Sequence, residues 1–433
     1  MVTFKQIDER NYWDAIGIEH GPGQGKFVAD GAEIVARAYA YRSCRARCWG
    51  IYTDERMVGL ALLEDLDEEP ACYHLSEFLI DRREQGNGYG QQALELLLKI
   101  CRLESKYDMV EVCVHKEAAA ARHVYGKAGF LDTGYVDEET PESLCLSCTW
   151  SAAEQRAYQW KRSGLSEQAA AGMASLLEKA SDRLWAAAET AYMGPLPHYP
   201  ICRLNPAERL AVWGLLAGKA AGVYTCRGIP EEIIWASLSD IGLRVRVYEQ
   251  EHGRPRLSKE DVIWFRHLVY GELFQLGALQ FQPFQMLYLD EEGCGEAYMT
   301  FLRKPLKTGS PVLNVHIPAG ADLSEYAVTK AFGQAEQFFS AFFPEFHPEA
   351  FLCYCWMLYP GLEKLLPGES RIRRFAAQFD VIGTADDPEN AVQRIFGNTK
   401  DRYAQDTTLQ RAAAGRLECL GEACGIRKIP QNS

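Results

Sequence analysis

The feature that most constrains this chain is a glycine-rich turn at residues 85–90. It lies between an apolar, strand-like run at residues 75–80 and a helix-like run at residues 91–106. Glycine lets the backbone approach a ligand closely, and free N–H groups at a helix N-terminus face an anion. This order of elements therefore predicts a pyrophosphate-binding loop, made of Gln85, Gly86, Asn87, Gly88, Tyr89 and Gly90.

A second segment, about thirty residues further on, completes the pattern. The strand-like residues 112–114 lead into a short helix that carries Tyr125 and ends on Gly129-Phe130. Together the two segments resemble the GNAT N-acetyltransferase superfamily, whose acetyl-CoA loop follows a Gln/Arg-x-x-Gly-x-Gly/Ala pattern and whose later helix often supplies a tyrosine. Through Phe27-Val28-Ala29 before a helix, Gly59, and Phe78-Leu79-Ile80-Asp81 before the glycine loop, residues 1–150 are similar to bacterial diamine and polyamine acetyltransferases. The resemblance implies an α/β (α+β) fold with a mixed, mostly antiparallel central sheet flanked by helices.

The chain of 433 residues is too long for one ordinary core. We expect a GNAT domain at residues 1–150, a helical region at residues 151–275 and a second α/β domain at residues 276–433. Residues 200–400 resemble N-acyltransferases with a helical N-terminal part and a GNAT-like C-terminal part, through residues 315–320 and 355–358. The second domain has Pro318-Ala319-Gly320-Ala321-Asp322 where a glycine loop would stand. We therefore expect it to be degenerate for CoA binding.

The charge of the chain is negative and uneven. The net charge is −13, and residues 1–150 hold 16 Lys and Arg against 26 Asp and Glu, a balance of −10. An acidic domain repels nucleic acid and favours cationic ligands. This bias favours an amine acceptor and argues against a nucleic-acid partner.

We find neither a targeting segment nor a metal-binding motif in the sequence. There is no apolar run of about 18 residues and no signal-peptide pattern, so we expect a cytoplasmic protein without a membrane partner. The 14 cysteines then read as reduced thiols. Cys145 and Cys148 are expected on opposite strand faces, and Cys353 and Cys355 lack a second ligand pair, so we expect no metal.

The GNAT resemblance assigns a cofactor site. Acetyl-CoA is the implied co-substrate, with its pantetheine arm paired along the strand that ends in Phe78, Leu79 and Ile80. A backbone N–H of this strand would stabilise the oxyanion that forms in acyl transfer. Ala118 and Ala121 lie on the face of Tyr125 and would leave room for the cofactor, although the family often has Asn at the position of Ala118.

Two side chains are candidate catalysts. Tyr125 would protonate the departing CoA thiolate, or alternatively it is a half-buried residue that packs under Phe130. Glu77 would deprotonate the amine, or alternatively it is a carboxylate that faces solvent. His74, three residues before Glu77, is expected on the opposite face of the strand and is the weaker base.

Further polar residues have a functional and a structural interpretation. An acidic run in the expected loop at residues 64–70 would attract a cationic acceptor or would simply be solvated. It comprises Glu64, Asp65, Asp67, Glu68 and Glu69. Glu19 is a candidate amine contact, and His115 and His123 are more typical of structural or surface positions.

The leading hypothesis is acetyl-CoA-dependent N-acetylation of a small amine such as a polyamine or an aminoglycoside. One alternative is acylation of a protein or peptide amine. Others are a non-catalytic acyl-CoA sensor and catalysis by the C-terminal domain alone. The two GNAT-like domains would form a monomeric pseudo-dimer, or the chain would form a homodimer.

Overall fold

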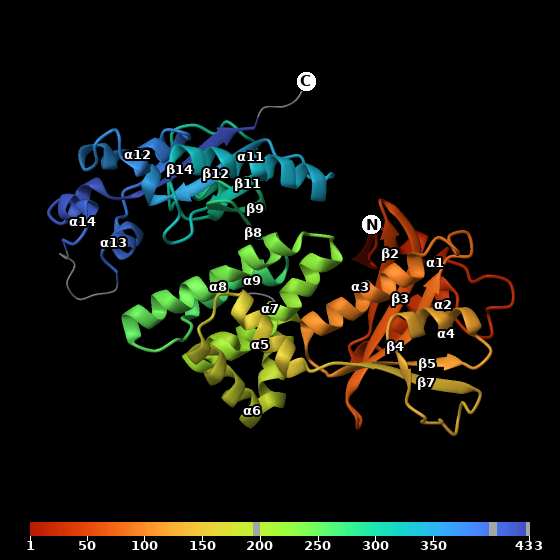
Figure 1. The fold of residues 1–433 in the computed structure, drawn as a ribbon. Coiled ribbons are helices and arrows are strands. Elements are labelled where there is room, and N and C mark those ends of the chain that lie inside the picture. Colours follow the sequence, from red (N-terminus) through yellow and green to blue (C-terminus); the bar gives the residue numbers. More distant parts are fainter. Residues whose placement is uncertain (194–199, 398–404, 430–433) are drawn as a thin grey trace. The chain divides into compact units, whose positions relative to one another are not determined.

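The computed structural model describes residues 1–193, 200–397 and 405–429. The chain forms two compact units (Figure 1). Unit 1 contains Met1–Leu238 and Leu257–Tyr270, and unit 2 contains Ser239–Arg256 and Gly271–Ser433. Unit 1 thus joins residues 1–150 to much of the helical region, while the boundaries expected at residues 150 and 275 stay predictions.

The first sheet has seven strands in the order β1-β2-β3-β4-β5-β7-β6. All neighbours pair antiparallel except β4 and β5, which are parallel. The strands are β1 Val2–Gln6, β2 Arg47–Thr53, β3 Arg56–Leu66, β4 Cys72–Ile80, β5 Met109–His115, β6 Leu131–Asp132 and β7 Ser143–Thr149. The mixed, mostly antiparallel sheet agrees with the expected fold class.

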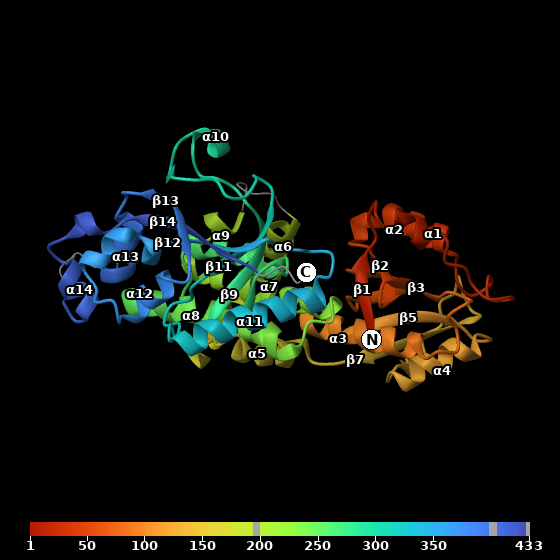
Figure 2. The same cartoon turned by 90° about the horizontal axis from the view of Figure 1, so that it is seen from above.

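Helices cover both faces of this sheet (Figure 2). One face packs on α1 Tyr12–Ile16 and α2 Gly31–Ala40 through side chains such as Leu60 and Leu62, and we call it the α1/α2 face. The other packs on α3 Tyr89–Glu104 and α4 Ala119–Lys127 through side chains such as Ala61 and Leu63, and we call it the α3/α4 face. The alternation of neighbouring β3 residues between the two faces is the ordinary strand period of two.

The two helices of the α1/α2 face begin differently. α1 begins after Asn11, and the preceding Asp8 accepts from the backbone N–H of Arg10. α2 begins at Gly31, where Asp30 is the N-cap and accepts from the N–H of Glu33. An Asp at this position satisfies one of the free N–H groups at the start of a helix.

The helical region continues unit 1. It comprises α5 Ala152–Arg162, α6 Glu167–Met193, α7 Pro206–Cys226, the first part of α8 Glu231–His252, and α9 Lys259–Val269. The helix α7 packs against α3, and a Cβ at Gly218 would lie only 2.1 Å from the carbonyl oxygen of Leu103. Only glycine permits this approach, so the helical region packs closely against α3.

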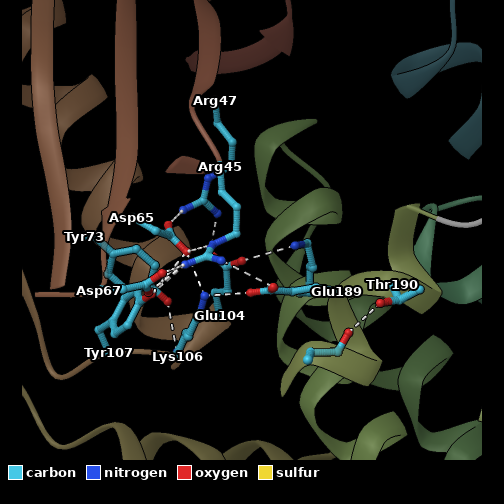
Figure 3. A network of polar contacts seen from close by, with 12 residues as sticks. Arg45, Arg47, Asp65, Asp67, Tyr73, Glu104, Lys106, Tyr107, Glu189 and Thr190 are labelled. Carbon is cyan, nitrogen blue, oxygen red and sulfur yellow. Dashed lines mark hydrogen bonds and ion pairs between the residues drawn. The ribbon is translucent and has the colours of Figure 1, made fainter. Parts of the chain in front are cut away.

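A network of buried charges adds to this contact (Figure 3). Arg47 bridges Asp65 and Glu104 at 2.9 and 2.5 Å, and Lys106 bridges Asp65 and Glu189 of α6 at 2.9 and 2.6 Å. Burial opposes the ionisation of Glu104, but the charges of Arg47 and Lys219 outweigh it and lower the pKa of Glu104 to about 2. The network therefore holds Glu104 ionised and ties α6 and α7 to the first sheet.

Unit 2 contains a second seven-stranded sheet, in the order β10-β13-β14-β12-β11-β9-β8. Its strands are β8 Phe274–Leu276, β9 Leu279–Gln285, β10 Thr300–Phe301, β11 Pro311–His316, β12 Ala350–Cys355, β13 Asp380–Ala385 and β14 Glu422–Lys428. Its helices after α8 are α10 Glu291–Cys294, α11 Glu325–Phe342, α12 Arg371–Ala376, α13 Glu389–Phe396 and α14 Thr408–Ala413. The parallel pair β11 and β12, joined through α11, repeats the arrangement of β4, α3 and β5.

Two features complete the second sheet. The strand β12 stops at Cys355, because Trp356–Leu358 form a 3-10 turn. The last strand, β14, pairs between β12 and β13. Among the described residues, no helix is both long and apolar enough to cross a bilayer.

The buried network yields a stability prediction. Glu104→Gln removes the charge that faces Arg47 and Lys219, and we expect it to lower the free energy of unfolding by about 3 kcal/mol. The matched control is Glu55→Gln, because Glu55 forms an exposed pair with Lys5, for which we expect a loss below about 1 kcal/mol. Urea unfolding of both variants measures the difference. Equal losses would show that the network does not stabilise unit 1.

Candidate active site

The candidate site begins where β4 parts from β5. The two strands are in register only at Tyr73 with Val110 and at His74 with Glu111, and the remainder of β4 has no partner on that side. On the other side β4 stays paired with β3 as far as Ile80. The first sheet is therefore open between the C-terminal halves of two parallel strands.

A β-bulge lies at the start of the opening, two residues after the last β4–β5 pair. Leu63 of β3 faces Leu75, but its neighbour Leu62 faces Glu77, so Ser76 is an extra residue in β4. The Ser76 hydroxyl donates to the carbonyl of Leu62 at 3.3 Å. A bulge bends its strand and re-aims the side chains that follow it.

The open edge of β4 presents backbone groups. The N–H of Asp81 donates to the carbonyl of Val58 in β3. Because backbone groups alternate along a strand, Leu79 also faces β3, while Phe78 and Ile80 face the opening. The predicted pantetheine-binding residues thus place N–H groups where β5 is missing.

The predicted glycine loop follows directly. Gly86 and Gly88 have φ values of +82° and +78°, which L side chains rarely adopt. Gly88 is also the N-cap of α3, and no side chain caps this end. The first N–H groups of α3 therefore lack a helical or capping partner, as an anion site requires.

The other loop residues hold its shape. Gln85 donates from Nε2 to the Ile80 carbonyl at 3.0 Å and to Gln24 at 2.8 Å. Asn87 donates to the carbonyl of Glu84 at 3.1 Å. Tyr89 starts α3 and packs on the core of the α3/α4 face, and Gly90 lies near Ile80.

Tyr125 lies on the α3/α4 face. Its side chain is 6% exposed, and its ring packs edge-on against Phe130 with centroids 5.4 Å apart. Burial, with the nearby charge of Glu77, raises the pKa of Tyr125 well above its ordinary value. Ala118 and Ala121 pack against the same core. This contact agrees with the alternative interpretation, in which Tyr125 is a residue that packs under Phe130. The role of Tyr125 as a general acid stays a prediction.

Glu77 approaches the opening from the other side. Its register with Leu62 directs it to the α1/α2 face, where Arg37 of α2 donates to its carboxylate at 2.9 Å. Burial raises the pKa of Glu77, although the N–H of Ala29 and the charge of Arg37 oppose the shift. The alternative of a solvent-facing carboxylate does not fit, because the side chain is only 10% exposed.

The expectation for His74 is wrong. Three residues separate it from Glu77, which in a regular strand puts the two on opposite faces. Because Ser76 is an extra residue in the bulge, the alternation of side chains shifts by one position. His74, which is opposite Glu64, therefore lies on the α1/α2 face together with Glu77. Burial and the charge of Arg37 lower the pKa of His74 to about 4, so its imidazole is neutral at pH 7.

The acidic run is also corrected. Glu64 and Asp65 belong to β3 and are buried, at 4% and 5% exposure, rather than forming part of a solvated loop. Asp65 faces the network of Arg45, Arg47 and Lys106, whereas Glu64 points to the α1/α2 face. Of the five residues, Asp67, Glu68 and Glu69 lie outside the strand.

The remaining candidates have other partners. Glu19 forms an exposed ion pair with Arg82 at 2.8 Å. His115 packs against Phe27 with ring centroids 5.0 Å apart, and His123 is exposed beside a shallow hollow of about 440 Å³ along the outer face of α4. None of the three contacts Glu77 or Tyr125 through a hydrogen bond or ion pair in the described residues.

Sequence reasoning missed Arg37 and Glu111. Arg37 is an ordinary basic residue in the last turn of α2, and no spacing links it to Glu77. Glu111 is one of several charged residues in a strand, and only its register with His74 places it on the α1/α2 face. Alternation from the buried Val110 and Val112 was the available signal for Glu111.

Comparison with known protein families bears on this geometry. Residues 22–130 match the model of the acetyltransferase (GNAT) family. A GNAT acetyltransferase domain is therefore present at residues 22–130. Residues 159–271 match an N-acyltransferase N-terminal domain, and residues 273–426 match a GNAT-like C-terminal domain. The chain is thus an acyltransferase of the acyl-CoA-dependent class with tandem GNAT-like domains.

Two solved acyltransferase complexes have a similar fold. An acyltransferase in complex with decanoyl-CoA and teicoplanin is 21% identical, with a TM-score of 0.52, over 64% of this chain and 88% of that one. A decanoyl-CoA complex of an acyltransferase is 19% identical, with a TM-score of 0.51, over the same shares. A spermidine N-acetyltransferase from Vibrio cholerae in complex with CoA and spermine was also matched, at 13% identity and a TM-score of 0.30, over 34% of this chain and 95% of that one. No curated protein matches this chain significantly.

The environment of His74 yields a pH prediction. Its pKa is about 4 in the folded protein and near 6.5 when exposed, so the unfolded chain binds more protons between these values. Stability is therefore full above pH 6.5 and is lost as the pH falls toward 4. We expect His74 to account for about 2 kcal/mol of the stability lost between pH 7.5 and 5.

Urea unfolding at both pH values measures this loss. His74→Asn should reduce the difference between the two pH values by that amount, and His123→Asn, at an exposed position on α4, should leave it unchanged. An identical pH dependence in wild type and His74→Asn would contradict the prediction.

Proposed function

We propose that residues 1–150 transfer an acetyl group from acetyl-CoA to the nitrogen of a small amine. The observation that carries the proposal is the opening between β4 and β5, which leads directly to the uncapped N-terminus of α3. An extended pantetheine arm would pair with the free edge of β4, and the pyrophosphate would bind at residues 85–90. No described group of three or more His, Cys, Asp or Glu is arranged to hold a metal ion.

In the proposed reaction the neutral amine attacks the thioester carbonyl. The charge that develops on the carbonyl oxygen would be stabilised by an N–H from the open edge, at Phe78 or Ile80. The C–S bond then breaks, the thiolate takes the phenol proton of Tyr125, and the nitrogen loses its proton to Glu77, directly or through water. The amide and free CoA are the products.

The environments of the two side chains support these roles. A tyrosine whose pKa is raised by burial stays protonated at pH 7 and is available as a proton donor. A glutamate whose pKa is raised accepts a proton more readily than a solvated one. The two residues lie on opposite faces of the first sheet, so a substrate in the opening would pass between them.

The acidic balance of residues 1–150 supports a cationic acceptor. Acylation of a peptide amine and a non-catalytic acyl-CoA sensor remain the alternatives. We also propose that the protein is cytoplasmic. For its oligomeric state we propose either a monomer in which the two GNAT-like domains form a pseudo-dimer, or a homodimer.

The second unit is the other candidate for acyl-CoA binding. The similarity to the acyltransferase extends over 64% of the chain, more than residues 1–150 alone supply. In the second unit, the parallel strands β11 and β12 are in register only from Val312 to Asn314 and diverge afterwards. We propose that the loop at residues 318–322, which lacks the glycine pattern, makes this unit the weaker CoA site.

The cofactor site can be tested by calorimetry. Titration of acetyl-CoA into the wild type should give about one equivalent, and Gly88→Glu should abolish it, because the substitution adds a carboxylate and strains a positive φ. Gly253→Glu is the matched control, since Gly253 also has a positive φ, of +72°, and open space around it. Two equivalents, or binding that survives Gly88→Glu, would place CoA in the second unit.

The acid is tested by Tyr125→Phe. This variant keeps the ring that packs on Phe130 but loses the hydroxyl, so we expect kcat for amine acetylation to fall about 10²–10⁴-fold. The dissociation constant for acetyl-CoA should stay within about two-fold of the wild type. Thiol release with a panel of amines measures turnover, and an unchanged kcat would reject Tyr125 as the acid.

A further inference from the structure

Three polar side chains form a row across the α1/α2 face of the first sheet. Glu64 of β3 is directly opposite His74 of β4, and His74 is in register with Glu111 of β5. Directly paired residues in neighbouring strands point to the same face, with Cβ atoms about 5 Å apart. We call Glu64, His74 and Glu111 the polar row.

Glu64 of the polar row is buried, His74 and Glu111 are half-buried, and the row is incompletely hydrogen-bonded. Glu64 is 4% exposed, and its Oε1 has no hydrogen-bond partner in the described residues, nor has the Nδ1 atom of His74. A buried carboxylate without a partner is costly. Its presence indicates that a group from outside the chain completes the row.

The surrounding charges define that group as a cation. No Lys or Arg in the described part of the chain forms an ion pair with Glu64 or Glu111, and the cationic Arg37 is engaged by Glu77. The lysine and arginines of the network lie around Asp65, which points to the α3/α4 face. His74 is neutral and contributes hydrogen-bonding capacity rather than charge.

The nature of the cation follows from spacing. The described residues contain no group of three His, Cys, Asp or Glu close enough to ligate one metal ion, so the row is too open for a metal. It lies at the closed end of the opening, roughly 7 Å along β4 from Glu77, since two regular strand steps separate them. An ammonium group on a short carbon chain spans such a distance.

We propose that the polar row binds the distal ammonium of a diamine or polyamine whose other nitrogen lies at Glu77. This inference rests on the proposed function of residues 1–150 and specifies its acceptor class. Glu64 and Glu111 supply the charge, and His74 accepts a hydrogen bond from the ammonium. The row selects the acceptor without touching the atoms that react.

Calorimetry with two probes of equal length tests the proposal. Titrations of 1,4-diaminobutane and of butylamine into the CoA-saturated wild type should show at least about ten-fold tighter binding of the diamine, the value of one well-placed ionic contact. Glu64→Gln and Glu111→Gln should each bring the two affinities within about two-fold. Glu178→Gln is the matched control, because Glu178 is exposed on α6 and its loss removes one charge without touching the sheet.

Kinetics and stability separate recognition from a structural role. Glu64→Gln should raise the KM for the diamine at least about ten-fold and leave kcat, and the KM for butylamine, within about two-fold. Its melting temperature should equal or exceed that of the wild type, because the substitution removes an unpaired buried charge. A lowered melting temperature with unchanged preference for the diamine would assign Glu64 a structural role and overturn the proposal.

The outcomes also distinguish the two levels of inference. Turnover of both amines with equal KM in the wild type would uphold the acetyltransferase and overturn the role of the polar row. Tight diamine binding that depends on Glu64, in a wild type that acetylates no amine, would uphold the polar row and reject the proposed function. Equal affinity of the wild type for both probes overturns the proposal directly.

Discussion

The separation of β4 from β5 is the constraint on which the rest of unit 1 depends. Two parallel strands that share only two residue pairs leave an edge of unpaired backbone groups inside a sheet, where such groups are costly unless a partner occupies them. The bulge at Ser76 adds a second effect, because it turns Glu77 toward α2. The same irregularity thus shapes the proposed cofactor channel, the candidate base and the face on which the polar row lies.

Much of this architecture is predictable from the sequence. Residues 85–90, Tyr125 and Gly129-Phe130 predicted the GNAT fold, and the strand before the glycine loop and the helix after it were also predicted. The position of Glu77 in the strand before the glycine loop was also predicted correctly. These features are local, since each depends on residues within a few turns or strand steps of one another.

The errors share one physical origin, which is that register is not a local property. The bulge at Ser76 has no neighbouring glycine or proline that would indicate it in the sequence. His74 was therefore predicted on the wrong face of the strand. Glu64 and Asp65 looked like the start of an acidic loop because charged residues rarely lie in buried strands. The burial of Asp65 depends on Arg45, Arg47 and Lys106, which are distant from it in sequence. The pairing of Arg37 with Glu77 depends on the packing of α2.

The junction between the first sheet and the helical region has a consequence for how the protein can be divided. Glu104 and Lys106 of the GNAT domain find partners on α7 and α6, and Gly218 admits the backbone of Leu103 at a distance no other residue allows. A fragment cut after residue 150 would expose apolar surface and leave these charges without their counterparts. Residues 1–150 and the helical region therefore share one packed and charge-paired junction, so that a substitution on one side of it alters the environment of the other.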